Sequence, residues 1–563
     1  MSASKLQEKE VRIGHSLNKK EEEFVIKRRE TVFQSLQKLN IPCSQDAVPH
    51  IALLGSGGGQ RAMVGLLGSL VQLDKAGLLD CILYLSGVSG STWCMASLYQ
   101  EPDWSTKLET VKDRIVERIK GPQVSLTDAM AKLKKYYYGK DFFSLTDLWA
   151  AVVVTAYVKE IDEHTLTDQW DHKNPFPIYT VIDKQCKQSI KEKDPWFEIS
   201  PHEAGYSLTG AFVETCNFGS QFDNGSKKKH QPEMDMLYLQ ALCGSALADG
   251  KEIKKFLLEK IKEFFKHLLP TIQTEMFEEM RKVCSCLFSS KDPKAPPVEK
   301  CFQVLMDLMD MNLSVLNVKD PSALDQSIRT TLNKLGGGKH QLIFPIEKLN
   351  LADKQAAKRY MKQHTEDVCN NLMKLYGHWF VQCIKNEPMA RQRSCMSLWR
   401  RSPPKPAKAC QSLETRDYED AGLLLNSPFF SVLRKERNTD LIISLDFSKS
   451  DPFTTVKQTA EMCKKLKIPF PEVNIPSEDL EKPKDFYVFK GQNAPTVIHI
   501  PLFNVVNCGD DIKTWRKKYH TFQDSYSAEK ITDLMEVAGK NISNNREKLK
   551  EQIAAAVGKK AHN

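Results

Sequence analysis

One stretch of the chain, from His50 to about Ser91, constrains the fold more than any other part of the sequence. The apolar run His50–Leu54 suits a buried strand, Gly55–Gly59 form a loop, and apolar residues at helical spacing then continue to Gly77, a capping glycine. The segment "CILYLSG" predicts a second buried strand, and another helix is expected from about Ser91. Strands that alternate with helices pair in parallel, so we predict an α/β domain with a central, mostly parallel sheet.

Three functions compete for the glycine loop in "GSGGGQRAM". A dinucleotide-binding fingerprint would need a third glycine where Gln60 stands. A phosphate-binding P-loop would need Lys followed by Ser or Thr, which Gln60-Arg61 does not supply. The third function is an oxyanion hole, because adjacent glycines let backbone N–H groups approach a developing negative charge in front of a helix N-terminus.

Ser89 lies between two glycines in the turn after the second predicted strand. The run Gly87-Val88-Ser89-Gly90-Ser91 has the G-x-S-x-G spacing of a nucleophile elbow, in which small neighbours allow a sharp strand-to-helix turn. The alternative is an ordinary serine in a tight turn, because this spacing often occurs by chance. The strand before it, the helix after it and the separate glycine loop upstream favour a nucleophilic Ser89.

The composition argues against two classes of protein. Of 563 residues, 41% are hydrophobic, which is enough for a sizeable core and argues against a disordered chain. Lys and Arg number 80 against 71 Asp and Glu. The resulting net charge of +9 is too mild for a nucleic-acid-binding protein but suits occasional contact with anionic lipid.

We expect a cytoplasmic protein that associates only peripherally with intracellular membranes. The first residues lack the apolar core of a secretory signal, and the longest apolar stretch, Leu148–Val158, is about half the ~20 residues of a spanning helix. The 15 cysteines show no zinc-ligand spacing, which favours reduced intracellular thiols.

The segments "GSGGGQRAM" and "LSGVSGSTW" resemble the paired motifs of the cytosolic (group IV) phospholipase A2 family. The likeness continues through "FSLTDLW", "WFEISPHEAGYSLTGAFV" and "DLIISLDFSKSDPF", and it covers nearly the whole chain from about residue 20. It is nearest to the gamma form, which lacks a C2 domain. The resemblance implies a patatin-like, three-layer catalytic domain with a nucleophile elbow and lid-type insertions.

The resemblance also implies a Ser-Asp dyad in place of a triad. The matching aspartate stands in "EDAGLLLNSPFF" and is Asp420. A carboxylate within reach of Ser89 could accept its proton during acylation and then assist water in deacylation. By the same resemblance, the N–H groups of Gly58 and Gly59 would hold the oxyanion. From the residues alone, Asp420 could equally be a turn residue, since Asp-Ala-Gly is typical of turns.

Two arginines match family positions associated with the lipid phosphate. Arg61 would stabilise the oxyanion region and the phosphate, and Arg437 would bind the head group. The planar guanidinium suits such a role because it donates two parallel hydrogen bonds. The plain alternative for Arg437 is a solvated surface, because charged residues surround it in "LRKERN".

One segment departs from the family pattern. The family normally has an apolar strand leading into the catalytic aspartate, whereas here Glu414 to Asp420 is polar except for Tyr418. Upstream, Arg391–Lys408 contains six basic residues, no acidic residue and three prolines, so we expect a disordered or lipid-touching loop. This departure predicts an altered strand before Asp420 and an altered position for its side chain.

We expect two parts, a charged N-terminal helical segment (1–45) and a catalytic domain (46–563) with variable insertions near 285–335 and 388–416. In the first part Phe24, Val25, Val32, Leu36 and Leu39 share a helix face. This face is expected to pack on the main body, with a lipid-facing helix as the alternative.

The predicted function is hydrolysis of fatty acyl esters in glycerophospholipids and lysophospholipids, at a phospholipid membrane surface and through an acyl-Ser89 intermediate. No cofactor or metal is expected, because no calcium-loop pattern is present and the chemistry needs none. One alternative is an esterase with a Ser-Asp-His triad, which would use His499 or His520. The other is a membrane-surface interaction protein that has kept the fold but lost activity.

Overall fold

The computed structural model describes residues 11–140, 144–168, 173–187, 194–223, 226–245, 415–521 and 523–561, together with separate pieces within 304–336, 349–371 and 390–393. The chain divides into two compact units. The first comprises Met1–Val124, Val154–Asp249 and Met389–Asn563, and the second comprises Ser125–Val153 and Gly250–Pro388. Residues 1–45 are therefore in the same unit as the catalytic motifs. Residues 285–303 of the first predicted insertion, and most of Arg391–Lys408, lie outside the described residues.

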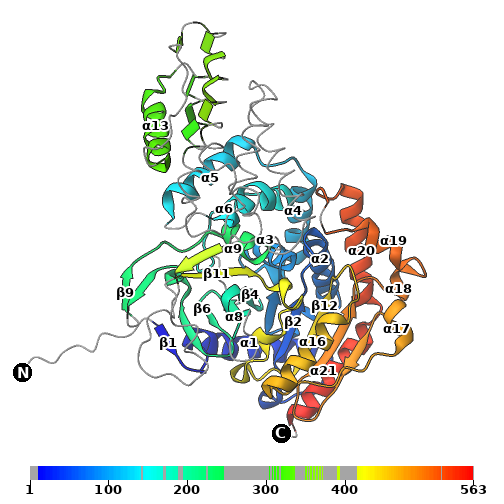
Figure 1. Cartoon of the computed structure of the whole chain (residues 1–563). Helices are drawn as coiled ribbons and strands as arrows, with labels where there is room; N and C mark the ends of the chain where they lie inside the picture. The colour runs from blue at the N-terminus through cyan, green and yellow to red at the C-terminus, as the bar shows by residue number, and fades with distance from the viewer. Residues whose placement is uncertain are drawn as a thin grey trace, which may run out of the picture. The chain divides into compact units, whose positions relative to one another are not determined.

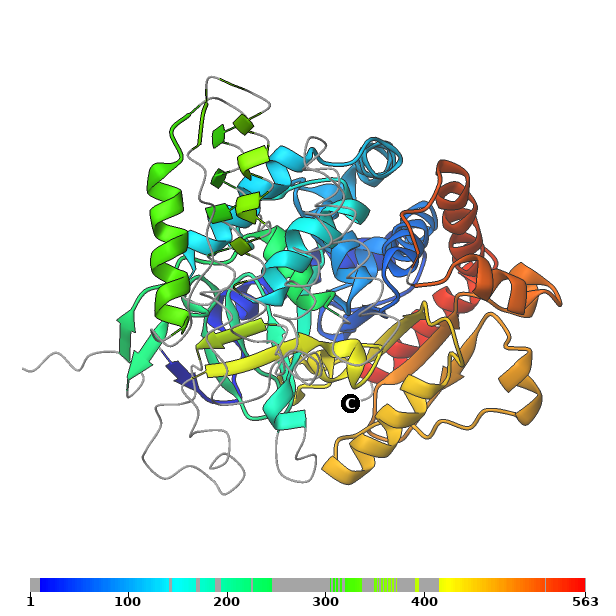
Figure 2. The same cartoon turned by 45° about the horizontal axis from the view of Figure 1, so that its top comes forward.

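A twelve-stranded sheet forms the centre of the first unit (Figure 1). Its main path runs β1-β7-β6-β5-β4-β3-β2-β12-β14-β13. Off this path, β11, yellow in Figure 2, pairs with both β4 and β10. The strands are β1 (Val11–Ile13), β2 (Ile51–Gly55), β3 (Tyr84–Gly87), β4 (Phe176–Asp183), β5 (Trp196–Ile199), β6 (Glu203–Tyr206), β7 (Ala211–Glu214), β10 (Ala390–Arg393), β11 (Thr415–Asp420), β12 (Leu441–Asp446), β13 (Tyr487–Phe489) and β14 (Thr496–Pro501). A separate hairpin joins β8 (Gln221–Asp223) and β9 (Ser226–Lys229).

The middle of the sheet is parallel. Strands β4, β3, β2, β12 and β14 pair in parallel, with Leu53 opposite both Leu85 and Ile443. Every residue of β2 and β3 is buried, as expected for strands covered on both faces. The predicted parallel core is confirmed, and antiparallel strands extend it on both sides.

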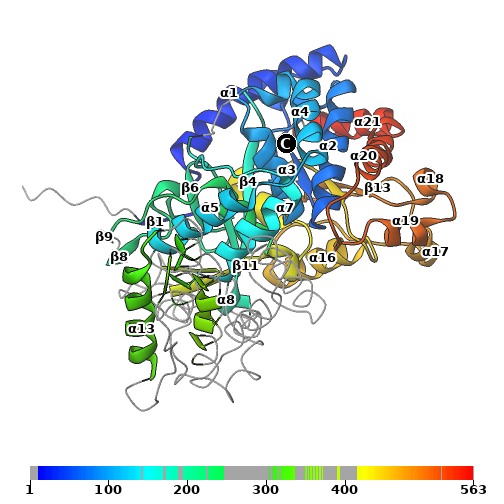
Figure 3. The same ribbon diagram turned by 90° about the horizontal axis from the view of Figure 1, so that it is seen from above.

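Helices cover both faces of this core. The crossover from β2 to β3 and that from β12 to β14 run in opposite directions along the sheet. Because such crossovers are right-handed, their helices α2 (Gln60–Lys75) and α16 (Thr454–Leu466) lie on opposite faces (Figure 3). Helices α3 (Gly90–Tyr99) and α20 (Ala528–Ser543) pack against α2, while α1 (Lys19–Lys38), α15 (Phe429–Val432) and α16 contribute to the core cluster on the other face. The three-layer prediction is confirmed.

The predicted N-terminal helix is α1. Phe24, Val32, Leu36 and Leu39 are buried, and Phe24 contacts the ring of Phe176 in β4. The apolar face of α1 therefore packs on the sheet, as expected. Further helices of this unit are α4 (Leu108–Lys120), α7 (Thr155–Val158), α8 (Lys184–Lys187), α9 (Met236–Cys243), α17 (Ser477–Glu481), α18 (Val505–Cys508), α19 (Ile512–Lys518) and α21 (Arg546–Ala561).

The second unit is helical in its described parts. It contains α5 (Leu126–Gly139), α6 (Leu145–Trp149) and α13 (Ser322–Gly336). Val304 and Leu308, within the predicted insertion near 285–335, are buried, as are Ile328 and Leu332 in α13. Among the helices that the structure describes in either unit, none combines the length and apolar character needed to cross a membrane.

Candidate active site

The candidate site lies where the chain reverses its direction along the sheet. Strands β2 and β12 are neighbours, and the crossovers that follow them leave in opposite directions. The loops after both strands therefore meet at the carboxyl edge of the sheet, the place where open α/β sheets bind ligands. They are joined by hydrogen bonds from Ser56 N–H to the Leu445 carbonyl (3.1 Å) and from Phe447 N–H to the Ser56 hydroxyl (2.6 Å).

Ser89 occupies the turn between β3 and α3. Its backbone has φ 52° and ψ −123°, a conformation that non-glycine residues rarely adopt and that is typical of a nucleophile elbow. Both flanking glycines are needed, because a Cβ on Gly87 would lie 2.6 Å from the Met95 sulfur and one on Gly90 would lie 1.8 Å from the Gly59 carbonyl oxygen. The strain at Ser89 is thus held by tight packing on both sides.

Asp420, at the end of β11, faces Ser89. Burial raises the pKa of its carboxyl to about 7, although hydrogen bonding to Gly422 N–H and to the Ser89 hydroxyl acts in the opposite direction. Oδ1 accepts from Gly422 N–H at 2.8 Å, while Oδ2 has no hydrogen bond of standard geometry from the described residues. A carboxyl with a pKa near 7, beside a serine hydroxyl, is well placed to accept its proton.

The strand before Asp420 is formed, so the predicted alteration is wrong. β11 pairs with β4, with Asp420 opposite Val181 and Tyr418 opposite Asp183. Tyr418 is fully buried, and the polar neighbours find partners: Arg416 lies 3.5 Å from Asp183 and Lys187 lies 3.1 Å from Glu419. Partners on the neighbouring β4 and α8 replace the apolar residues that a central strand would normally use.

The glycine loop brings two N–H groups to the same edge. Gly58 has φ 154° and Gly59 has φ 59°, and Gly59 is the N-cap of α2. The N–H of Gly57 donates to the Asn426 carbonyl (2.9 Å), whereas those of Gly58 and Gly59 have no acceptor in the described part of the chain. Gly59 packs against the elbow through Gly90, so these free donors lie next to Ser89.

Comparisons with known proteins identify the family of this chain. A family model described as a lysophospholipase catalytic domain matches residues 51–281. The chain is 33% identical to cytosolic phospholipase A2 gamma of Mus musculus over 578 residues, which cover 96% of this chain and 92% of the relative. It is 30% identical to cytosolic phospholipase A2 gamma of Homo sapiens over 566 residues, which cover 98% and 97%. This chain belongs to the cytosolic phospholipase A2 family.

Solved structures show the same fold. Human GIVD cytosolic phospholipase A2 matches with a TM-score of 0.67 at 21% identity, over 98% of this chain and 69% of that chain. A second structure of that human protein, in complex with methyl gamma-linolenyl fluorophosphonate, matches with a TM-score of 0.62 over 99% and 66%. The predicted patatin-like fold of the cytosolic phospholipases is therefore confirmed.

Within this family fold, Arg61 holds the glycine loop in place. Its side chain is buried; Nε donates to the Phe447 carbonyl (2.6 Å), and Nη1 donates to the Tyr519 carbonyl (2.7 Å) and the Thr521 hydroxyl (3.1 Å). Nη2 lies against Gly58, 2.8 Å from where a Cβ would stand. Arg61 thus ties α2 to two distant loops, and only Nη2 is directed toward the oxyanion loop.

Arg437 does not lie at the site, and its predicted head-group role is corrected by the structure. It precedes β12 at the opposite, amino edge of the sheet, where Nε donates to Glu21 (2.9 Å) and Nη2 donates to Glu198 (2.7 Å). Burial acts to lower its pKa, but Glu198 and Glu21 raise it above the ordinary arginine value. The side chain is buried between these carboxylates and joins α1 to the sheet.

Two residues at the carboxyl edge were not predicted. Asn426 donates through Nδ2 to the Gly57 carbonyl (3.2 Å) and to the Ser448 hydroxyl (2.9 Å), which links the aspartate loop to the other two loops. Arg516, in α19, is half-buried, and its charge acts on Arg61, although it has no ion pair or hydrogen bond among the described residues. The basic run "WRKK" was the available signal for Arg516, whereas nothing in the sequence singles out Asn426.

The two histidines of the triad alternative occupy different places. His499 lies within β14, where Nε2 contacts the Pro452 carbonyl (2.9 Å) and Nδ1 contacts the Ser444 hydroxyl (3.3 Å). Burial lowers its pKa to about 4, as for a packed core histidine. His520 precedes Thr521, whose side chain adjoins Gly59, so only His520 belongs to a segment at the candidate site.

Proposed function

We propose that this chain is a phospholipase A2 and lysophospholipase that cleaves fatty acyl esters of glycerophospholipids and lysophospholipids through an acyl-Ser89 intermediate. The observation that carries the proposal is the strained Ser89 facing a buried Asp420 whose pKa is raised to about 7. Membership of a family whose relatives are named cytosolic phospholipases A2 supports the substrate class.

Acylation would begin with attack of the Ser89 hydroxyl oxygen on the ester carbonyl carbon. Asp420 accepts the hydroxyl proton, and the free N–H groups of Gly58 and Gly59 stabilise the oxyanion that forms. As the tetrahedral intermediate collapses, the carbonyl carbon–oxygen bond to the glycerol breaks. The proton passes from Asp420 to the departing alcohol oxygen.

Deacylation would use the same groups in the reverse direction. Water attacks the acyl-Ser89 carbonyl carbon while Asp420 accepts a proton from the water, and the proton then returns to the Ser89 oxygen as the fatty acid leaves. Asp420 provides the proton transfer and the backbone provides the charge stabilisation. We therefore infer that calcium is not needed for the chemistry, and fatty-acid release should persist in excess chelator.

The finer location is also part of this proposal. We infer a cytoplasmic enzyme that associates peripherally with phospholipid surfaces, supported by the net charge of +9 and by relatives that are named cytosolic. Arg516 is the arginine we assign to the lipid phosphate in place of Arg437. It lies at the carboxyl edge with no hydrogen bond or close ion pair in the described chain, although the charges of Asp451 and Asp446 act on it, whereas Arg437 is held directly by two carboxylates.

The test is fatty-acid release from phosphatidylcholine and lysophosphatidylcholine vesicles with chelator present. Ser89→Ala and Asp420→Ala should each lose roughly a thousandfold or more in kcat, as for residues that act as one unit. Asp417→Asn, on the same strand but paired with Gln185, is the matched control and should stay within about twofold. Full activity of Ser89→Ala would refute the mechanism, and a silent wild type that still binds vesicles would favour the interaction-protein alternative.

A further inference from the structure

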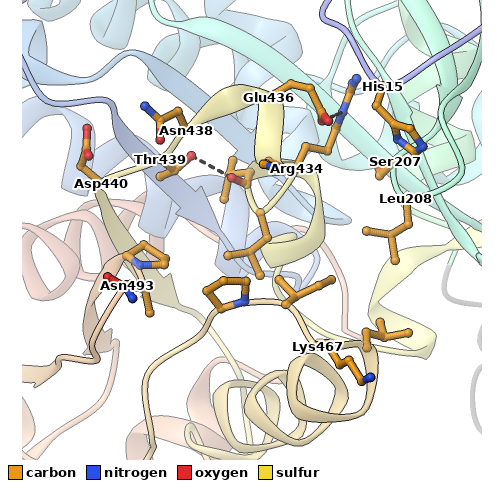
Figure 4. Close-up of a pocket in the computed structure, with 18 of the residues that line it drawn as sticks. His15, Ser207, Leu208, Arg434, Glu436, Asn438, Thr439, Asp440, Lys467 and Asn493 are labelled. Atoms are coloured by element: carbon orange, nitrogen blue, oxygen red, sulfur yellow. Dashed lines mark hydrogen bonds and ion pairs between the residues drawn. The ribbon is translucent and has the colours of Figure 1, made fainter. Parts of the chain in front are cut away.

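A cavity of about 610 Å³ lies in the first unit (Figure 4). None of the residues that line it belongs to the loops around Ser89. Its walls come from the segment before β12, the end of α16 and the residues that lead into β14, with His15 and the Ser207-Leu208 pair on another side. Because β12 and β14 are parallel, these residues mark the amino edge of the sheet, opposite the carboxyl edge with the elbow. The volume falls within the ~300–1,000 Å³ range of small-molecule sites.

The cavity carries uncompensated positive charge. Both of its carboxylates are engaged: Asp440 accepts from His50 N–H (2.7 Å) and pairs with Lys560 (2.6 Å), and Glu436 lies 3.7 Å from Arg434. Lys435 and Lys467 also line it, are exposed, and have no ion pair among the described residues. An anionic group would therefore meet two available ammonium groups there.

Arg434 adds a buried cation to the wall. Its Nη1 donates to Glu198 (2.7 Å), and its guanidinium lies 4.5 Å from the centre of the Phe212 ring. Nε and Nη2 have no hydrogen-bond acceptor in the described chain, although the side chain is almost fully buried. Buried donors without hydrogen-bond acceptors are uncommon. Because Glu198, Glu203 and Glu436 lie 2.7, 3.9 and 3.7 Å from this guanidinium, its charge is balanced, and it offers the cavity hydrogen-bond donors while the two lysines offer the charge.

The remainder of the cavity is apolar. Leu466 at the end of α16 is 47% exposed although it is a large hydrophobic residue, and it lines the cavity beside Lys467. The other apolar members include Leu208, Val432, Leu433, Ile468, Pro469 and Pro495. The lining thus offers both an alkyl-binding surface and an anion-binding rim.

We propose that this cavity binds a single-chain amphiphile, an alkyl chain joined to an anionic head group, at a site separate from the catalytic edge. The head group, a carboxylate or a phosphate, meets Lys435 and Lys467, and the alkyl chain lies along Leu433, Leu466 and Ile468. Fatty acids and lysophospholipids with a net negative head group have this chemistry. The site depends only on the cavity and its charges, so it stands independently of the proposed catalytic activity.

Photo-crosslinking with a diazirine-bearing palmitate tests the proposal on the full chain. Mass spectrometry should find adducts in peptides that contain residues 432–440 or 466–469. The double variant Lys435→Gln/Lys467→Gln should reduce these adducts roughly fivefold, as expected for the loss of two exposed charge contacts. Leu466→Asp, at an exposed position, should reduce them as well, while Lys464→Gln/Lys465→Gln on the exposed surface of the same helix should not.

Competition separates the possible ligands. Laurate competing better than lysophosphatidate would identify a carboxylate ligand, and the reverse order would identify a phosphate ligand. Equal competition by an uncharged monoacylglycerol, or adducts insensitive to both lysine changes, would overturn the anionic part of the proposal. Displacement by inorganic phosphate alone would overturn the alkyl part. Phosphatidylcholine hydrolysis by the double variant should equal that of wild type, which keeps this test apart from that of the catalytic site.

Discussion

Replacing Asp420 by Asn should stabilise the fold increasingly as the pH rises, while it abolishes activity. Burial raises the pKa of the folded carboxyl from 3.8 to about 7, so ionisation of Asp420 opposes folding. The contribution of this carboxyl to stability is complete below its unfolded pKa near 3.9 and is lost as the pH rises through about 7. At ~1.4 kcal/mol per pKa unit, the loss approaches about 4 kcal/mol by pH 8, against about 1.5 kcal/mol at pH 5.

Urea unfolding of wild type and Asp420→Asn at pH 5 and pH 8 measures this difference directly. The free energy of unfolding of the variant should exceed that of wild type, and this excess should be roughly 2.5 kcal/mol larger at pH 8 than at pH 5. Asp446, whose pKa burial also raises to about 7, is present in both proteins and cancels. A stability difference that does not change with pH would refute the reasoning that Asp420 is destabilised by its burial.

The same pKa sets the pH dependence of turnover, and three further changes follow from the contacts of the site. Because Asp420 must be ionised to accept a proton, kcat/KM should fall about a hundredfold from its plateau to pH 5, and a flat profile would exclude this base. Gly90→Ala should abolish ester hydrolysis because its Cβ would overlap the Gly59 carbonyl, while Gly558→Ala, with open space around it, should have no effect on hydrolysis rates. Arg437→Ala should lower the free energy of unfolding by about 3–5 kcal/mol, because Glu21 and Glu198 would be left buried without a partner. Arg516→Ala should raise KM for phospholipid severalfold and leave the urea midpoint unchanged. The opposite pattern would return the head-group role to Arg437. His520→Ala should retain activity on phosphatidylcholine vesicles, and a loss with unchanged circular dichroism would revive the Ser-Asp-His alternative.

The sequence predicted best those features whose backbone conformation depends only on neighbouring residues. The elbow at Ser89 and the loop at Gly58 and Gly59 are short turns whose backbone angles demand small residues, so their patterns are visible in the chain itself. The face of α1 was equally readable, since helical periodicity determines which side chains meet the sheet.

Features that depend on distant partners could not be read in this way. The polar lead-in to Asp420 becomes a buried strand only because β4 and α8 supply partners for Arg416 and Glu419. Arg437 looks like part of an exposed basic run, yet Glu21, far away in the sequence, and Glu198 enclose it. A charge pattern does not reveal whether its counter-charges come from solvent, from substrate or from another helix.

The contact between Gly90 and the Gly59 carbonyl makes the two motifs a single mechanical part, although they are encoded separately. A side chain at Gly90 would displace the Gly59 carbonyl, and one at Gly57 would stand 3.1 Å from the Ser89 Cβ. An attempt to move this catalytic centre into another sheet would have to carry β2, β3 and both turns together. Activity lost through a substitution in one motif should therefore be restored by a compensating change in the other.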